Sequence, residues 1–447
     1  MEFNEFKETL FKRAKESGFS ECEVYYIDRE SLSIGIYESE VEKYNLNNTF
    51  GLSFRGKIDN KIGYSYTEIL DEEAIDMLIT NAKSGAISIE SKDLQFIYEG
   101  DKEYPEVISY SEKLENVKAE DLINLALKLE KDIKDYSDKV VNRNGCALGY
   151  SSSKYGIYNT KGLNLTNKVN ALTAYGVPII EVNDEKYDGF GYQIADSLEE
   201  VDTKKIAKEA VEEALKKVGA VSIKSGNYKT IIYNEAMVSL MSTFSSIFNA
   251  DTAQKGLSLL KDKEGEVIAS DILNIVDDPL LKGGLASTPF DDEGVATFKK
   301  NIVKNGKLIT LLHNLKTAYK AGVKTTGNGF KSSYASTVSI APTNFYIEKG
   351  TIDLEDLIST VDEGIMVTDF AGLHSGASSV SGDFSLAAKG FYIKDGKKQY
   401  PIEQITVAGN FFDLLKNIEN IASDLKFPMS SIGSPSILIK ELSVAGK

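Results

Sequence analysis

The chain has 447 residues, of which 42% are hydrophobic and 26% are charged, a mixture typical of a folded protein and not of a disordered one. Its 51 Lys and Arg residues against 67 Asp and Glu residues give a net charge of −16. Such a charge repels phosphate backbones and anionic lipids, so we expect neither a nucleic acid nor a membrane as partner.

Cysteine and histidine are the scarcest residues with reactive side chains. The chain holds two of each, Cys22, Cys146, His313 and His374. Two separated thiols exclude a disulfide scaffold and Cys-rich zinc modules, and they suit a reducing compartment. The first ten residues lack the apolar core of a signal peptide, and no apolar run approaches the roughly 18 residues of a membrane span. We therefore expect a cytoplasmic protein.

The first half of the chain alternates between helical and strand periodicity. Apolar residues at helical spacing predict helices over residues 3–14, 71–82, 122–133 and 206–218. Alternating apolar residues predict strands near 32–36 and a hairpin that turns at Asp59–Asn60. Residues 139–197 return to strands, with a turn at Tyr158–Gly162.

The polar, Gly- and Ser-bearing segment Ser222–Asn227 predicts a domain boundary, which separates residues 1–222 from residues 228–447. Beyond it an apolar helix at about Glu235–Phe248 is expected, then short strands, a last helix at Phe411–Ser423 and a closing strand at Ser436–Ile439. The expected strands include Lys299–Thr310, Ser336–Ile340, Asn344–Ile347 and Gly390–Ile393, the last followed by a hairpin turn at 394–397.

The predicted fold class is α+β with two domains. The N-terminal domain is expected to combine antiparallel strands with helices. The C-terminal domain is expected to be mostly β, either barrel-like or a sandwich, with a buried helix.

No metal-binding motif is evident. A catalytic zinc usually takes three protein ligands, but H-E-x-x-H is absent and His313 and His374 lie far apart in sequence. A site gathered from histidine and carboxylates across the fold stays open. The acidic segment Asp291–Gly294 lacks the spacing of an EF-hand, and because it ends in glycine it predicts a defined turn.

Motifs for nucleophilic and phosphate chemistry are incomplete. Gly372–Gly376 places His374 where a G-x-S-x-G motif has its serine, and the glycine-rich segment 322–329 lacks the Lys-Ser/Thr of a phosphate loop. Glycine-rich backbone beside exposed strand edges suits instead the addition of an extended peptide to a sheet. His374 therefore either contacts a ligand or lies in solvent, whereas His313 is expected to be structural.

Several segments occur in an order similar to that of the TldD/PmbA (TldE) family, once called modulators of DNA gyrase. Residues 287–294, with the sequence Asp-Asp-Glu-Gly at their end, resemble one signature of that family. Further similar segments are Tyr158–Gly162, Asn305–Leu308, Thr325–Gly329, Ser381–Ser385, Gly390–Ile393, Tyr400–Ile402 and Ala408–Asn410. The resemblance covers nearly the whole chain.

The TldD branch of that family is a zinc peptidase with an H-E-x-x-x-H helix and a cysteine ligand near its C-terminus. Alignment on Lys255, Gly256 and Ser258 places Met241 and Ser246 at the positions of the two histidines and Ser242 at the position of the glutamate. No cysteine follows Cys146. The resemblance thus implies a PmbA/TldE-like, non-catalytic subunit without a cofactor of its own. Zinc would be held by a TldD-type partner, and the pair would bind and process unfolded peptides.

Three segments and the single residue His374 hold the candidates for contact with peptide or partner: Asp291, Asp292, Glu293, Gly294, Thr326, Gly327, Asn328, His374, Gly382, Asp383 and Phe384. Two other functions stay open. One is a homodimeric metal-dependent peptidase that uses His374 and Asp291–Glu293. The other is a peptide-binding scaffold with no proteolytic role.

Overall fold

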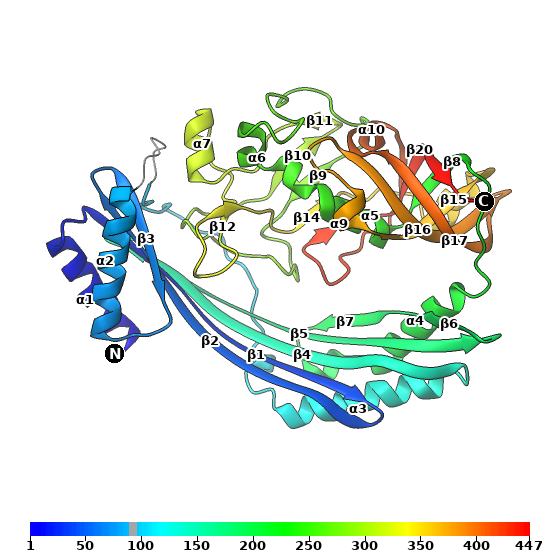
Figure 1. The fold of residues 1–447 in the computed structure, drawn as a ribbon, viewed down its shortest axis with the longest axis horizontal. Helices are drawn as coiled ribbons and strands as arrows, with labels where there is room; N and C mark the ends of the chain where they lie inside the picture. Colours follow the sequence, from blue (N-terminus) through cyan, green and yellow to red (C-terminus); the bar gives the residue numbers. More distant parts are fainter. Residues whose placement is uncertain (89–95) are drawn as a thin grey trace.

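The computed structural model describes residues 1–88 and 96–447. A long, curved antiparallel sheet built by the N-terminal region lies beneath a β-rich C-terminal region (Figure 1). The two regions are joined by the segment between α4 (Thr203–Lys216) and β8 (Gly226–Ile232). The domain boundary predicted at Ser222–Asn227 overlaps this segment and the first residues of β8, and it stays a prediction.

Within the described residues, the N-terminal sheet has seven strands in the order β3-β2-β1-β4-β5-β6, with β7 also paired to β5. Its strands are β1 (Glu21–Tyr37), β2 (Glu40–Ile58), β3 (Lys61–Thr67), β4 (Val140–Asn159), β5 (Asn164–Val182), β6 (Glu185–Asp188) and β7 (Gly191–Ala195). All the pairs are antiparallel, as expected for strands joined by tight hairpins. Four strands of 17 to 20 residues give the sheet its length.

Two of the predicted hairpins are confirmed. Asp59 and Asn60 both have positive φ, of 50° and 62°, which is the geometry of a two-residue turn between twisted strands. At the other turn, the Asn159 side-chain oxygen accepts hydrogen bonds from the Lys161 and Leu163 amides at 2.9 and 3.2 Å. This turn connects β4 to β5 as the sequence predicts.

Helices pack on both ends of this sheet. α1 (Phe3–Glu16) and α2 (Glu72–Ser88) enclose one core with β1 and β2, while α3 (Ala119–Tyr136) and α4 enclose another with β4 and β5. All four helices confirm the predicted periodicity. Asp71 caps α2, because its Oδ1 accepts a hydrogen bond from the Ala74 amide at 2.7 Å.

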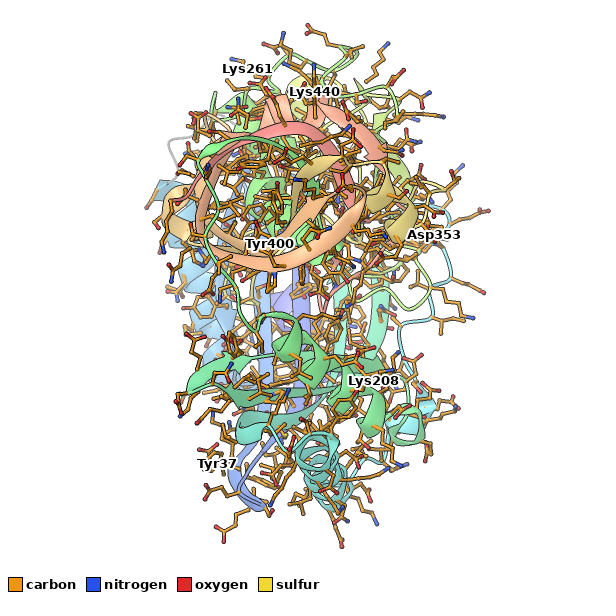
Figure 2. All side chains as sticks on the ribbon, turned by 90° about the vertical axis from the view of Figure 1, so that its right-hand side faces the viewer. Tyr37, Lys208, Lys261, Asp353, Tyr400 and Lys440 are labelled. Atoms are coloured by element: carbon orange, nitrogen blue, oxygen red, sulfur yellow. The ribbon has the colours of Figure 1, made fainter. Side chains whose placement is uncertain are left out.

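The C-terminal region contains a closed barrel, which decides between the two predicted β architectures. In the described residues β17-β16-β15-β8-β20 form a ladder that the β17–β20 pairing closes. Its later strands are β15 (Glu363–Ala371), β16 (Asp383–Lys394), β17 (Lys397–Asn410) and β20 (Ile437–Ala445). Figure 2 looks along this barrel, with Tyr400 of β17 on the side that faces α4 and its Lys208. The α+β class is confirmed.

Short strands and helices surround the barrel. A second sheet has the order β11-β10-β9-β14-β19, and β12 pairs with β13. These strands are β9 (Ile275–Asp277), β10 (Lys300–Lys304), β11 (Lys307–Leu308), β12 (Gly329–Phe330), β13 (Ser339–Ile340), β14 (Phe345–Ile347) and β19 (Ile432–Gly433). The short helices are α6 (Ala250–Gln254), α7 (Leu315–Ala321), α8 (Leu354–Ser359), α9 (Leu373–Gly376) and α10 (Phe411–Lys416).

Three predicted elements differ from the structure. The strand predicted at Lys299–Thr310 is a hairpin, since Asn305 and Gly306 turn with positive φ. Only the last two residues of Ser336–Ile340 pair as a strand. The helix predicted at Phe411–Ser423 ends at Lys416, because the chain then forms β18 (Ile418–Ile421), which pairs with β20.

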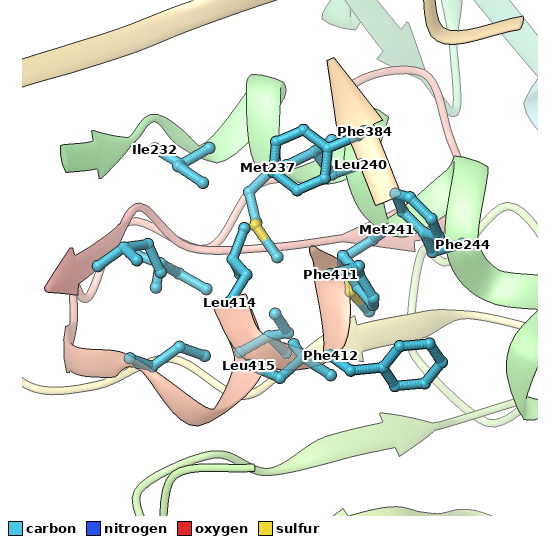
Figure 3. Packing of buried hydrophobic residues seen from close by; sticks show 14 of the residues in the cluster. Ile232, Met237, Leu240, Met241, Phe244, Phe384, Phe411, Phe412, Leu414 and Leu415 are labelled. Atoms are coloured by element: carbon cyan, nitrogen blue, oxygen red, sulfur yellow. The ribbon is translucent and has the colours of Figure 1, made fainter. Parts of the chain in front are cut away.

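The predicted buried helix is α5 (Asn234–Phe244), which continues as a 3₁₀ turn through Phe248. Its apolar face carries Met237, Leu240, Met241 and Phe244, all at most 1% exposed. Figure 3 shows this face packed against the residues of α10. The Phe244 ring stacks on Phe411 with centroids 4.5 Å apart. This packing fixes which face of α5 is left for solvent.

In the part of the chain that the structure describes, no helix is long and apolar enough to cross a membrane.

Candidate functional site: a chamber between the two regions

A cavity of about 1480 Å³ lies between the N-terminal and C-terminal regions and is lined by side chains of both. Pockets for small molecules measure about 300–1,000 Å³. The cavity, called the chamber below, therefore has room for a segment of polypeptide.

The N-terminal wall of the chamber comes from α4 and β7. Ile206, Ala210 and Ala214 bury one face of α4, and the opposite polar face presents the carboxylates of Glu209, Glu212 and Glu213 to the chamber. Beside α4, Phe190 is 41% exposed. Its ring stacks on Tyr192 at 5.6 Å and lies 5.9 Å from Tyr175. This wall is thus both acidic and aromatic.

The opposite wall comes from α5, the barrel strands and the segment 426–430. From α5 it receives Ser239, Ser242 and Thr243, whose side chains lie on the face that the core leaves open. Lys426 pairs with Glu235 at 2.5 Å, and its ammonium lies 5.3 Å from the centre of the Tyr192 ring. Lys426 therefore contacts both walls of the chamber.

The chamber includes part of α5, the helix that the sequence resemblance aligns with the zinc helix of the TldD branch. Met241 is 1% exposed, and Figure 3 places it in the core beside Phe411. Ser242 lines the chamber, and Ser246 is half-buried. A thioether facing the core and two hydroxyls do not fit zinc, which takes Cys, His or carboxylate ligands. Across residues 1–88 and 96–447, no group of three or more His, Cys, Asp or Glu side chains is placed to hold a metal ion.

The two histidines lie in different surroundings. His374 is exposed on the short helix α9 and lines the chamber together with Ser242. His313 is 1% exposed, with Nδ1 3.3 Å from the Thr317 hydroxyl, and burial lowers its pKa. His313 packs inside the C-terminal region, as expected of a structural residue.

The predicted turn at Asp291–Gly294 is present, but its acidic side chains are buried at the contact with the N-terminal sheet. Asp291 Oδ1 accepts hydrogen bonds from the Glu293 and Val295 amides, both at 3.0 Å, and its Oδ2 accepts one from Gly329 at 2.9 Å. Gly294 turns with a φ of 82° against Leu163 of the N-terminal region. We call this contact, formed by Asp291–Gly294, Lys331 and the ends of β1 and β2, the junction.

Charged residues meet in the junction, where they are largely buried. Arg55 pairs with Glu23 at 2.6 Å, and Glu23 is only 1% exposed. The Lys331 ammonium donates to the Ser53 hydroxyl at 2.6 Å, and its amide donates to Asp292 Oδ2 at 2.8 Å. The bond from Lys331 to Ser53 connects the N-terminal sheet to the loops of the C-terminal region, whereas the other two interactions each lie within one region.

Burial governs the titration of these groups. It raises the pKa of Asp292 to about 6 and raises the pKa values of Asp291 and Glu293 as well. Burial also lowers the pKa of Lys331 to about 8. The junction therefore disfavours ionisation on both sides, as expected of charges removed from water.

The second candidate loop lies against the junction. Thr326, Gly327 and Asn328 are all buried. The Asn328 side-chain oxygen accepts from Lys300 at 3.1 Å, and its amide donates to Asp277 at 2.9 Å. The structure thus brings this loop together with Asp291–Gly294, as the Gly329 bond to Asp291 shows.

The third candidate segment begins β16. Gly382 is buried against Phe412, and Phe384 is 3% exposed with its ring 6.4 Å from Phe244. Asp383 is exposed and accepts a hydrogen bond from Asn410 at 2.9 Å. Of the candidates taken from the sequence, His374 and Asp383 are thus the exposed side chains, and contact with peptide or partner stays a prediction for all of them.

Several residues of the chamber were not predicted from the sequence, namely Phe190, Tyr192, Glu209, Glu212, Glu235 and Lys426. Two of them, Glu209 and Glu212, share a polar stripe on α4, which is also what any solvated helix face shows. The others are far apart in the chain and carry no motif.

Comparison with known proteins gives three matches in order along the chain. Residues 22–86 match PmbA/TldA metallopeptidase domain 1, residues 112–218 match the PmbA/TldA metallopeptidase central domain, and residues 225–446 match the PmbA/TldA metallopeptidase C-terminal domain.

Individual relatives agree with these matches. The metalloprotease PmbA homolog of Buchnera aphidicola subsp. Acyrthosiphon pisum (strain APS) is 27% identical over 99% of this chain and 96% of its own. A crystal structure from Thermotoga maritima MSB8, which carries the name of a DNA gyrase modulator, is 33% identical with a TM-score of 0.91, covering 99% of this chain and 100% of that one. TldE from Thermococcus kodakarensis shares the fold, with a TM-score of 0.90 at 23% identity over 99% of this chain and 100% of that one.

The matched segments, the identity along the full chain and the barrel with its buried helix lead to one conclusion. The chain belongs to the PmbA/TldD metallopeptidase family, and within it is PmbA/TldE-like.

Proposed function

We propose that this chain is the non-catalytic, peptide-binding subunit of a TldD–TldE-type metallopeptidase complex. Zinc and the water-activating carboxylate would come from a TldD-type subunit. This chain would hold unfolded peptide in the chamber.

The observation that carries the proposal is the chemistry of α5 at the chamber wall. Met241 lies in the core, and at the two other aligned zinc-helix positions Ser242 faces the chamber and Ser246 is half-buried. Beside Ser242, α5 also presents Glu235, Val238, Ser239 and Thr243 to the chamber, and Glu235 is paired with Lys426. A serine hydroxyl is not among the usual zinc ligands, and it cannot replace the carboxylate that activates water. It can, however, form hydrogen bonds with the backbone of a bound peptide.

The form of the chamber supports an extended peptide as its occupant. In the described structure β7 pairs with β5 alone, so its other edge has no strand partner, and Tyr192 of β7 lines the chamber. An extended peptide that pairs with a strand edge is held by main-chain hydrogen bonds, which recognise any sequence. Binding of this kind suits a subunit that receives unfolded chains.

The proposal is tested by mixing the purified chain with a TldD-type protein from the same organism. We expect a stable complex in size-exclusion chromatography and cleavage of unfolded peptide by the mixture but not by this chain alone. Absence of a complex, together with peptidase activity of this chain alone, would overturn the proposal.

A further inference from the structure

We infer that the chamber selects polypeptide segments rich in Lys and Arg and disfavours acidic ones. This inference rests on the proposed function, since it names the class of peptide that the chamber takes. It is carried by the charges on the chamber walls and by the exposed aromatic side chains next to them.

The walls of the chamber carry more negative than positive charge. Eight carboxylates and five lysines line it. Three of the lysines already have carboxylate partners within the lining: Lys217 lies 3.2 Å from Glu213 and 3.9 Å from Asp188, Lys398 lies 2.8 Å from Glu355, and Lys426 lies 2.5 Å from Glu235. The remaining charged lining residues, four carboxylates against Lys216 and Lys389, therefore decide which charge a bound peptide meets, and their balance is negative.

Among the described residues, Glu212, Asp369 and Glu403 line the chamber without a salt bridge within 4.0 Å. Glu209 has only Lys205 of its own helix, at 3.9 Å. The Glu212 carboxylate accepts a hydrogen bond from the neutral Tyr136 hydroxyl at 2.9 Å, which leaves its charge uncompensated. These carboxylates come from both walls, so a peptide between the walls would face them from two sides.

The geometry of a chamber strengthens the effect of this charge. Protein walls of low dielectric focus the field into a cleft and raise the local concentration of ions of opposite sign. Two unit charges at a given separation also interact several times more strongly near a protein surface than in water. A cationic side chain of the peptide beside Glu209 or Glu212 therefore strengthens binding, and an acidic side chain there weakens it.

The aromatic rings beside α4 also favour cationic side chains. Phe190 stays 41% exposed although it stacks on Tyr192 and lies beside Tyr175. The face of an aromatic ring attracts Lys and Arg, and their alkyl chains pack on it. The chain itself gives an example, because the ammonium of Lys426 lies 5.3 Å from the centre of the Tyr192 ring.

The experiment uses the full chain and three fluorescent 12-residue peptides that differ only at four positions, which hold Lys, Gln or Glu. Affinities are measured by fluorescence anisotropy at low and at high salt. We expect the Lys peptide to bind about 10-fold more tightly than the Glu peptide at 50 mM salt, and the difference to fall below about 3-fold at 500 mM salt because screening shortens the range of the charges.

A matched pair of double variants assigns the effect to the chamber. Glu209→Gln with Glu212→Gln should weaken binding of the Lys peptide about 3-fold to 10-fold and leave binding of the Gln peptide unchanged. Glu5→Gln with Glu8→Gln removes the same charge from exposed positions of α1, at the other end of the molecule (Figure 1). This control should change the binding of neither the Lys peptide nor the Gln peptide. Circular dichroism checks that both variants are folded.

Three other outcomes would each contradict one or both of the two proposals or the assignment to the chamber. Equal binding of the three peptides would overturn the charge preference and leave the proposed function standing. An equal effect of the two double variants would show that net charge, and not the chamber, sets the preference. Binding of none of the peptides would overturn both proposals.

Discussion

Acidic residues gather in two places in this molecule, in the junction and on the walls of the chamber. In the junction, Asp291 is 0% exposed and both of its oxygens accept backbone hydrogen bonds. In the chamber, Glu209 is exposed and Glu212 half-buried, on the polar face of α4. The same functional group thus holds two parts of the chain together in one place and lines an open cavity in the other.

The comparison shows that a conspicuous motif and an open site need not coincide. Asp291–Gly294 is prominent in the sequence because three acidic residues precede a glycine, yet in this chain the motif is used to form a buried turn. The chamber residues are inconspicuous because they are spread from residue 188 to residue 430. The predictions below test this difference, from the largest expected effect to the smallest.

Removal of one partner of the buried ion pair should have the largest effect on stability. Arg55→Ala leaves Glu23, which is 1% exposed, without its cation, and such a loss costs about 3–5 kcal/mol. The free energy of unfolding in urea measures this cost. The matched chamber variant Lys217→Ala should cost at most about 1 kcal/mol, because Lys217 is partly exposed. Equal costs would show that the junction is not a buried structural contact.

The two faces of α5 should differ in the same way. Phe244→Ala removes a ring that is 0% exposed and stacked on Phe411, which should cost about 3–5 kcal/mol in the free energy of unfolding. Ser242→Ala changes the chamber face of the same helix and should stay within about 0.5 kcal/mol of the original chain. A large loss from Ser242→Ala would contradict its assignment to an open wall.

The junction should also respond to pH, since the folded state raises the pKa of Asp292 from its ordinary 3.8 to about 6. As the pH falls from 6 to 4, the folded protein takes up a proton that the unfolded chain does not yet bind, so this residue adds stability. Relative to Asp292→Asn, the original chain should gain about 2 kcal/mol between pH 7 and pH 4. Urea unfolding of both proteins at several pH values measures this difference, which a pH-independent result would contradict.

The smallest effect is expected at the aromatic wall of the chamber. Phe190→Ala removes an exposed ring, so stability should change by less than about 1 kcal/mol. The affinity for a Lys-containing peptide should fall about 3-fold to 10-fold, because one cation–π and packing contact is worth about 1 kcal/mol. Fluorescence anisotropy measures the affinity, and the exposed Phe298→Ala outside the chamber lining is the control. An unchanged affinity would exclude Phe190 from the binding surface.

Much of the fold could be predicted from the sequence, because local periodicity determines it. The four N-terminal helices and the Asp59–Asn60 hairpin follow from apolar spacing and turn residues. The prediction of the last helix was wrong after Lys416. Ile418 and Ile421 continue the helical spacing of α10, but their backbone pairs with β20. Pairing with a distant strand leaves no local signal.

The site could be predicted only in part, for the same reason. His374 and the position of Ser242 were identified from the sequence, and both line the chamber. The wall that faces them comes from α4 and β7, which the fold brings there from the other region of the chain. No spacing rule connects Glu212 with His374, so only the three-dimensional arrangement shows that they share a cavity.

The central claim, that this chain binds peptide and does not cleave it, is tested most directly by one measurement on the purified chain. The chain is incubated with zinc and dialysed, and its metal content and its peptidase activity on an unfolded peptide are determined together. The account predicts far less than one zinc per chain and no cleavage until a TldD-type subunit is added. One zinc per chain, with cleavage by the chain alone that a chelator abolishes, would contradict it.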